Sequence, residues 1–137
     1  MRSPVRQKAD RQLGLLNGTW LVMDGHIGGV RLPDNAFDEL TLTLENGRFE
    51  LGIDLGRVVV DREAAPAALD LVIVAGPNRG RYVPAIVERV GQLLRICFDL
   101  AGMERPATFR APAGTRYFLA TYRRAAARDR RLPSQVA

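Results

Sequence analysis

From Thr19 onward, apolar and polar residues alternate along the chain, and turn residues interrupt this alternation at short intervals. A period of two predicts β-strands with one buried face rather than amphipathic helices. We therefore expect an all-β chain with eight main strands. These cover residues 19–25, 38–45, 48–55, 57–63, 69–75, 81–90, 92–100 and 116–124, and a further short strand is expected over 107–111.

The strongest local pattern is a pair of alternating runs joined by Asn46 and Gly47. Both residue types accept the positive φ angles of a two-residue hairpin turn. In the run that follows, every second residue is apolar, which predicts a single strand with Phe49, Leu51, Ile53 and Leu55 on its core face.

Nearly all of the predicted strands are linked by short connections. Closing such a meander on itself removes the exposed sheet edges that favour aggregation. The sequence therefore predicts an eight-stranded antiparallel up-and-down barrel. An immunoglobulin-like sandwich is the competing fold, but it requires long crossovers between its two sheets.

The composition fits one domain, since 137 residues with 47% hydrophobic content can build one core but hardly a second. The formal charge of +5 is unevenly placed, with +3 on residues 1–12 and +4 on residues 123–137. We expect a basic, flexible arm over 1–12, a barrel over 13–124 and a basic tail over 125–137. Because the barrel itself is nearly neutral, nucleic acid is not the expected partner.

The first residues are charged and lack the apolar core of a signal peptide, and no later run reaches the roughly 20 apolar residues of a membrane span. We therefore expect a soluble, cytoplasmic protein.

Gly18 stands two residues before Trp20, the only tryptophan, where the first predicted strand begins. In a barrel closed by its first and last strands, a glycine there lets the chain turn tightly across one end. Trp20 is then expected to point inward and plug that end. Arg123 and Arg124 finish the last predicted strand, where a guanidinium over the indole would contribute about 0.5–2 kcal/mol.

The Gly18-x-Trp20 pattern with a terminal-strand arginine resembles the structural signature of the lipocalin and fatty-acid-binding superfamily. The order of motifs over residues 13–124 is further similar to that of a small lipocalin-like domain family of unknown function, first noted in Planctomycetes bacteria. The motifs are Gly18-Thr19-Trp20, Leu69-Asp70-Leu71, the turn over 76–80, Ile96-Cys97-Phe98, and Arg105-Pro106 followed by Phe109. This resemblance implies a lipocalin-like, or calycin-like, barrel and brings no established activity.

Counting strand faces from Trp20 predicts a wholly apolar or aromatic barrel interior. An eight-stranded barrel is either filled by such side chains or wide enough for one small ligand, and the sequence leaves both open. The predicted interior residues are Trp20, Val22, Leu42, Leu44, Phe49, Leu51, Ile53, Leu71, Ile73, Val87, Leu94, Ile96, Phe98, Phe118 and Tyr122.

Two loops are expected at the ends of the barrel. The loop over 26–37 is predicted to shape the open mouth, so that His26 and Arg31 become candidate ligand contacts. Arg105 and Phe109, in the long connection after the seventh strand, are expected to fold back and cap one end. Arg105 would there bond backbone carbonyls, or alternatively pair with an acidic group of a ligand or partner.

No set of residues predicts catalysis. Cys97 lies in an apolar run and is expected to behave as a small hydrophobe, and no metal-ligand or cofactor spacing occurs around His26.

We therefore expect a non-enzymatic domain that binds a small apolar or amphipathic molecule at the barrel mouth, without cofactor or metal. The candidate contacts are Val22, His26, Arg31, Leu42, Phe49, Leu51, Ile53, Leu71, Ile96, Phe98, Phe118 and Tyr122. The alternative is a protein-interaction or assembly module with a filled barrel, whose arginine-rich ends contact an acidic protein partner.

Overall fold

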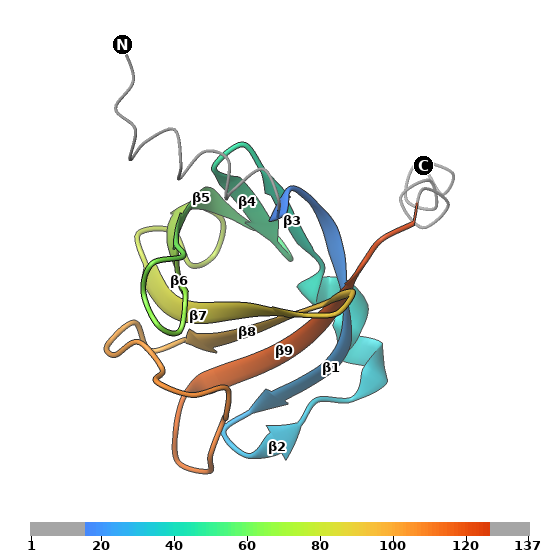
Figure 1. Cartoon of the computed structure of the whole chain (residues 1–137), viewed down its shortest axis with the longest axis vertical. Helices are drawn as coiled ribbons and strands as arrows, with labels where there is room; N and C mark the ends of the chain where they lie inside the picture. The colour runs from blue at the N-terminus through green and yellow to red at the C-terminus, as the bar shows by residue number, and fades with distance from the viewer. Residues whose placement is uncertain (1–15, 127–137) are drawn as a thin grey trace.

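The computed structural model describes residues 16–126, so the predicted basic arm and nearly all of the basic tail lie outside the described residues. Figure 1 shows a single curled sheet that closes on itself. Its elements are β1 (Gly18–Ile27), β2 (Val30–Arg31), the 3₁₀-helix η1 (Asp34–Leu40), β3 (Leu42–Glu45), β4 (Arg48–Leu51), β5 (Asp54–Asp61), β6 (Ala68–Ala75), β7 (Tyr82–Val90), β8 (Leu93–Asp99) and β9 (Tyr117–Arg124). No helix among residues 16–126 is long and apolar enough to cross a membrane.

The barrel is closed by its first and last strands. All neighbouring strands pair in an antiparallel manner in the order β1-β3-β4-β5-β6-β7-β8-β9, and β9 pairs back to β1. The short β2 pairs only with the last two residues of β1 and is not one of the eight barrel strands. The prediction of an eight-stranded antiparallel up-and-down barrel is therefore confirmed, and the sandwich is excluded.

One end of the barrel is closed around Trp20, as expected. The indole is fully buried and its N–H donates to the Leu16 carbonyl at 2.9 Å. The Arg124 guanidinium lies 4.3 Å from the ring centroid and also donates to the Asn17 carbonyl. Gly18 has a φ of 138°, and a Cβ there would overlap the Arg124 guanidinium, so the glycine gives both the backbone conformation and the space.

The segment between β1 and β3 differs from the prediction. Residues 38–45 do not form one strand, because η1 takes residues up to Leu40 and β3 begins at Leu42. The apolar spacing of Leu40, Leu42 and Leu44 continues through the helix end, which is why the alternation was misleading. Since β1 pairs with β3 only as far as Trp20, the gap beyond is covered by η1 and the loop before it, which pack Leu32, Phe37 and Leu40 against the core.

The run over 48–55 is also not one strand. It folds into a tight turn at Gly52 and Ile53, with Gly52 at a φ of 60°, so that Leu51 of β4 pairs with Asp54 of β5. The predictions that Ile53 and Leu55 face the core are wrong, because their side chains are 76% and 42% exposed. The alternation happens to continue across the turn, which hides it from a periodicity argument. The residues over 107–111 form no strand either.

Gly56 fixes the tight curl of β5 against β6. The register of the two strands shifts between Leu55 and Gly56, which marks a β-bulge. A Cβ at Gly56 would overlap the carbonyl oxygen of Val72 and lie 2.7 Å from the Phe49 ring. The space is thus filled by the backbone of the neighbouring strand, which cannot rotate away.

Substituting Gly56→Ala is expected to destabilise the fold by more than about 3 kcal/mol, because the methyl group must displace backbone. Gly25→Ala is a matched control, since its Cβ would meet only side chains, the nearest at 3.3 Å. Urea unfolding followed by Trp20 fluorescence measures both. Equal costs in the two variants would show that close packing at Gly56 does not limit the strand curl.

Candidate functional site

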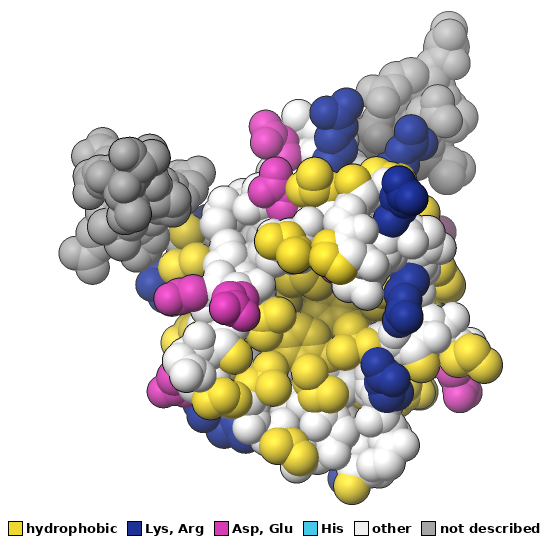
Figure 2. All heavy atoms as spheres, turned by 180° about the vertical axis from the view of Figure 1, so that it is seen from behind, with side chains coloured by type: hydrophobic (Ala, Val, Ile, Leu, Met, Phe, Trp, Pro, Cys, Tyr) yellow, Lys and Arg dark blue, Asp and Glu magenta, His cyan; other side chains and the backbone are white. Residues whose placement is uncertain are grey.

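The barrel interior has two unlike halves. Around Trp20 it is filled with close-packed side chains, and these residues are buried: Leu42, Leu44, Leu94, Ile96 and Tyr122. At the opposite end, where β4 ends and β5 and β7 begin, a pocket of about 170 Å³ remains. Figure 2 shows a hollow with hydrophobic walls on the back face of the molecule, with Lys and Arg side chains along one side of it.

The pocket wall is made by inward-facing residues of four strands. Strand alternation turns every second side chain of each strand into the barrel, so neighbouring strands contribute one ring of apolar groups. The apolar lining is Phe49 and Leu51 from β4, Leu71 and Ile73 from β6, Val83 from β7, Phe98 from β8, and Leu100 just after it.

One side of the rim is fixed by a hydrogen-bonded pair. Asp54, at the start of β5, accepts hydrogen bonds from the Asn78 backbone N–H at 3.1 Å and from its side-chain amide at 2.7 Å. These bonds hold the turn over 76–80 beside the β4–β5 turn. Each carboxylate oxygen of Asp54 thereby accepts one hydrogen bond.

The other polar lining residues are Arg81 and Arg116. The Arg81 carbonyl accepts from the Ile73 N–H at 2.9 Å, and the Arg116 carbonyl accepts from the Leu100 N–H at 3.0 Å, so both backbones are held in place. Among residues 16–126, neither guanidinium has a hydrogen-bond or ion-pair partner. The mouth therefore combines an apolar wall with two available cations.

A larger groove of about 770 Å³ lies on the outer side of β3, β4 and β5. It is open to solvent, and most of its lining side chains are polar or charged: Thr43, Glu45, Asn46, Arg48, Glu50 and Arg57. An apolar or amphipathic molecule would bury little surface there, so the smaller pocket at the mouth is the better candidate site.

Four of the predicted ligand contacts line this pocket, namely Phe49, Leu51, Leu71 and Phe98. The others in the interior set are placed in the packed core instead: Val22, Leu42, Ile96, Phe118 and Tyr122. Phe118 stacks on Phe98 with ring centroids 5.5 Å apart, and so forms the layer behind the pocket wall. Ile53 is excluded by its exposure.

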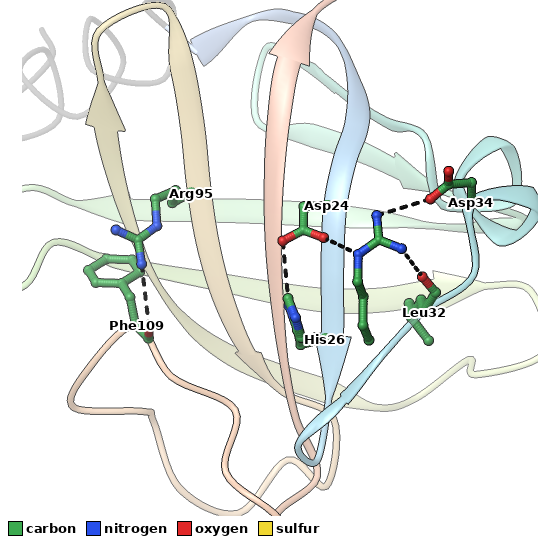
Figure 3. Close-up of polar contacts among 7 residues, drawn as sticks. Asp24, His26, Leu32, Asp34, Arg95 and Phe109 are labelled. Carbon is green, nitrogen blue, oxygen red and sulfur yellow. Dashed lines mark hydrogen bonds and ion pairs between the residues drawn. The ribbon is translucent and has the colours of Figure 1, made fainter.

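His26 and Arg31 do not lie in the pocket lining, contrary to the prediction. Figure 3 shows His26 reaching toward Asp24 of β1. Asp24 accepts from Arg31 Nε at 2.8 Å and lies 3.6 Å from His26 Nδ1, and Arg31 also bonds Asp34 at 3.0 Å and lies over the Phe37 ring. A bulge between Val22 and Asp24 shifts the side-chain parity of β1, which the sequence pattern does not reveal.

The segment around Arg105 does not cap a barrel end either. Arg105 donates to the Ala85 carbonyl at 2.9 Å and pairs with Asp70 at 2.7 Å, both at the β6–β7 side of the wall. Farther along, the Phe109 ring lies under the Arg95 guanidinium of β8, as Figure 3 shows. The long connection thus covers the outer face of β7 and β8. The predicted carbonyl bond of Arg105 is present, but on the outside of the barrel.

The polar residues of the mouth were missed in the sequence. The predicted turn over 76–80 is confirmed, Arg81 is predicted within the strand that follows, and Asp54 is predicted within one continuous strand. A signal was available, since Arg81 directly precedes β7 and Arg116 directly precedes β9 at the same barrel end. It could be used only once the true strand ends were known.

Tyr122 offers a test of the core packing. Its hydroxyl is buried without a hydrogen-bond partner among the described residues, and burial raises its pKa. Tyr122→Phe is therefore expected to leave stability unchanged or raise it by up to about 1 kcal/mol. Tyr82→Phe is the control, because that hydroxyl donates to Asp70 at 3.0 Å and its loss should cost about 0.5–1.5 kcal/mol. Urea unfolding distinguishes the two; a larger cost for Tyr122→Phe would contradict this account.

Cys97 is predicted to be an unreactive thiol. It is buried under the long connection, its S–H donates to the Arg110 carbonyl at 3.4 Å, and burial raises its pKa to about 11. At pH 8 roughly one thousandth of the Cys97 side chains are thiolate. Reaction with a disulfide reagent should therefore be slow until the long connection over Cys97 opens. Arg105→Gln loosens that segment and should speed the reaction. Because the pKa of Cys97 is higher in the folded protein, the neutral thiol contributes to folding stability below about pH 9. This contribution is lost as the pH rises toward 11.

Among residues 16–126, no group of three His, Cys, Asp or Glu side chains is placed to hold a metal ion. Comparisons with protein-family models, curated proteins and solved structures found no match for this chain. The barrel is therefore established by strand order and register, and the resemblance to a lipocalin-like domain family stays a prediction.

Proposed function

We propose that this chain is a non-enzymatic, lipocalin-like binding domain that holds a small apolar or amphipathic molecule at the open end of its barrel. The observation that carries the proposal is the pocket at the mouth. It is walled by seven apolar residues and rimmed by a few polar ones, which is the usual make-up of a small-molecule site.

The size of the pocket limits what enters it. An apolar protein cavity of about 150 Å³ is large enough to bind benzene. The pocket here is about 170 Å³, so it accommodates one ring or a short alkyl chain rather than a long lipid. Each square ångström of apolar surface that such a group buries contributes about 25 cal/mol.

Binding without chemistry is supported by where the reactive side chains lie. Cys97 is enclosed beneath the long connection, and His26 lies 3.6 Å from Asp24 on β1. Neither lines the pocket, and nucleophilic catalysis would require a nucleophile and a base to meet there.

The alternative function, contact with an acidic protein through the basic ends, depends mainly on residues outside the described range. No structural observation favours it. Native mass spectrometry of protein purified gently from its host separates the two functions, because a small non-covalent adduct supports the binding domain and a co-purified protein supports the interaction module.

Filling the pocket should abolish binding of a benzene-sized probe. Ile73→Phe enlarges an inward side chain of the wall, whereas Val74→Phe enlarges its exposed neighbour on the same strand and is the matched control. Fluorobenzene binding, followed by ¹⁹F NMR, should weaken at least about tenfold in the first variant only. If Ile73→Phe unfolds, Val83→Leu at the β7 wall replaces it. Equal binding in the filled and control variants would contradict the proposal.

A further inference from the structure

Some arginines of this barrel are engaged within the protein, as Arg95 is with Glu88 at 2.8 Å and Arg105 is with Asp70 at 2.7 Å. Others have no hydrogen-bond or ion-pair partner among residues 16–126, and Arg48 and Arg57 are examples on the outer side of β4 and β5. The two that line the pocket, Arg81 and Arg116, have no such partner among residues 16–126. Unpaired guanidinium groups beside an apolar pocket are available to a ligand.

The topology places these two arginines near each other. Arg81 directly precedes β7 and Arg116 directly precedes β9, and both strands pair with β8. Neighbouring strands lie about 4.8 Å apart, and the registers of β7 and β9 on β8 offset Arg81 from Arg116 by two residues, so their backbones are roughly 12 Å apart. Two arginine side chains can therefore converge on one group above the pocket. Figure 2 shows Lys and Arg side chains gathered along one side of the hollow.

The acidic residue of the lining cancels only part of this charge. Asp54 is the only carboxylate among the lining residues, so it can offset one of the two positive charges, and its oxygens accept hydrogen bonds from Asn78 rather than from an arginine. It lies at the start of β5, on the far side of β6 from Arg81. The rim is thus cationic on the side of β7 and β9.

We infer that the ligand is an amphipathic organic anion, with its apolar body in the pocket and a carboxylate held between Arg81 and Arg116. This inference rests on the proposed function and adds the class of ligand and its orientation. A carboxylate suits guanidinium groups because each can donate two parallel hydrogen bonds to it. Since the arginines are exposed at the rim, the electrostatic part of the affinity should fall as ionic strength rises.

The test compares three probes with the same six-carbon chain: hexanoate, 1-hexanol and hexylamine. Binding to the ¹⁵N-labelled full chain is followed by amide chemical shifts at low salt. Hexanoate is expected to bind roughly tenfold more tightly than hexanol, and hexylamine more weakly than both. Shifts are expected at the backbone amides of pocket residues on β6 and β7.

Arginine variants identify the group that holds the anion. Arg81→Gln and Arg116→Gln should each reduce hexanoate affinity several-fold, and together bring it to the level of hexanol, with hexanol affinity unchanged. Arg79→Gln is the matched control, because Arg79 is an exposed residue of the same turn that does not line the pocket. Its removal changes the net charge equally and should leave hexanoate binding nearly intact.

The outcomes separate this inference from the proposed function. Equal binding of hexanoate and hexanol would overturn the inference and leave the apolar pocket in place. Failure of all three probes to bind in the pocket would overturn both. Hexanoate that still binds to Ile73→Phe, or loses as much affinity in Arg79→Gln as in Arg81→Gln, would show surface attraction only and would also overturn the inference.

Discussion

The pairing of β1 with β9 is the interaction on which the rest of the structure depends. It turns an open meander into a closed ring, and it brings Arg124 over the indole of Trp20 across the closed end. Gly18 is required at the same point, because a side chain there would occupy the space of the arginine. Once this end is closed and filled, any space left inside the barrel must lie at the other end.

The two ends of the barrel therefore differ in composition. The closed end is completed by the protein's own groups, with the indole N–H and the guanidinium of Arg124 both bonded to backbone carbonyls of the entering chain. At the open end, the apolar wall is incomplete and two arginines lack partners among residues 16–126. The contacts at the closed end stabilise the fold, whereas the apolar wall and the two arginines at the open end are available to a ligand. This contrast supports a ligand at the mouth more than a barrel that serves only as a scaffold.

Much of the fold could be predicted because strand periodicity is local. Alternation alone predicts that Trp20, Phe49, Leu71 and Phe98 face the interior, and the turn residues Asn46 and Gly47 predict their hairpin. Errors arose where an alternating pattern crossed a structural boundary without changing. Ile53 sits in a turn that preserves the apolar period, and η1 interrupts a run whose leucines continue into β3.

The sequence by itself determined that the chain is all-β, that its strands follow one another in a closed antiparallel order, and which side chains form most of the core. These features follow from the two-residue period and from turn chemistry, both of which act over a few residues. Only the tertiary structure decided which loops meet at which end. The bulge in β1 turns His26 away from the pocket, because it changes the side to which the following residues point, whereas the strand ends place Arg81 and Arg116 in the lining of the mouth.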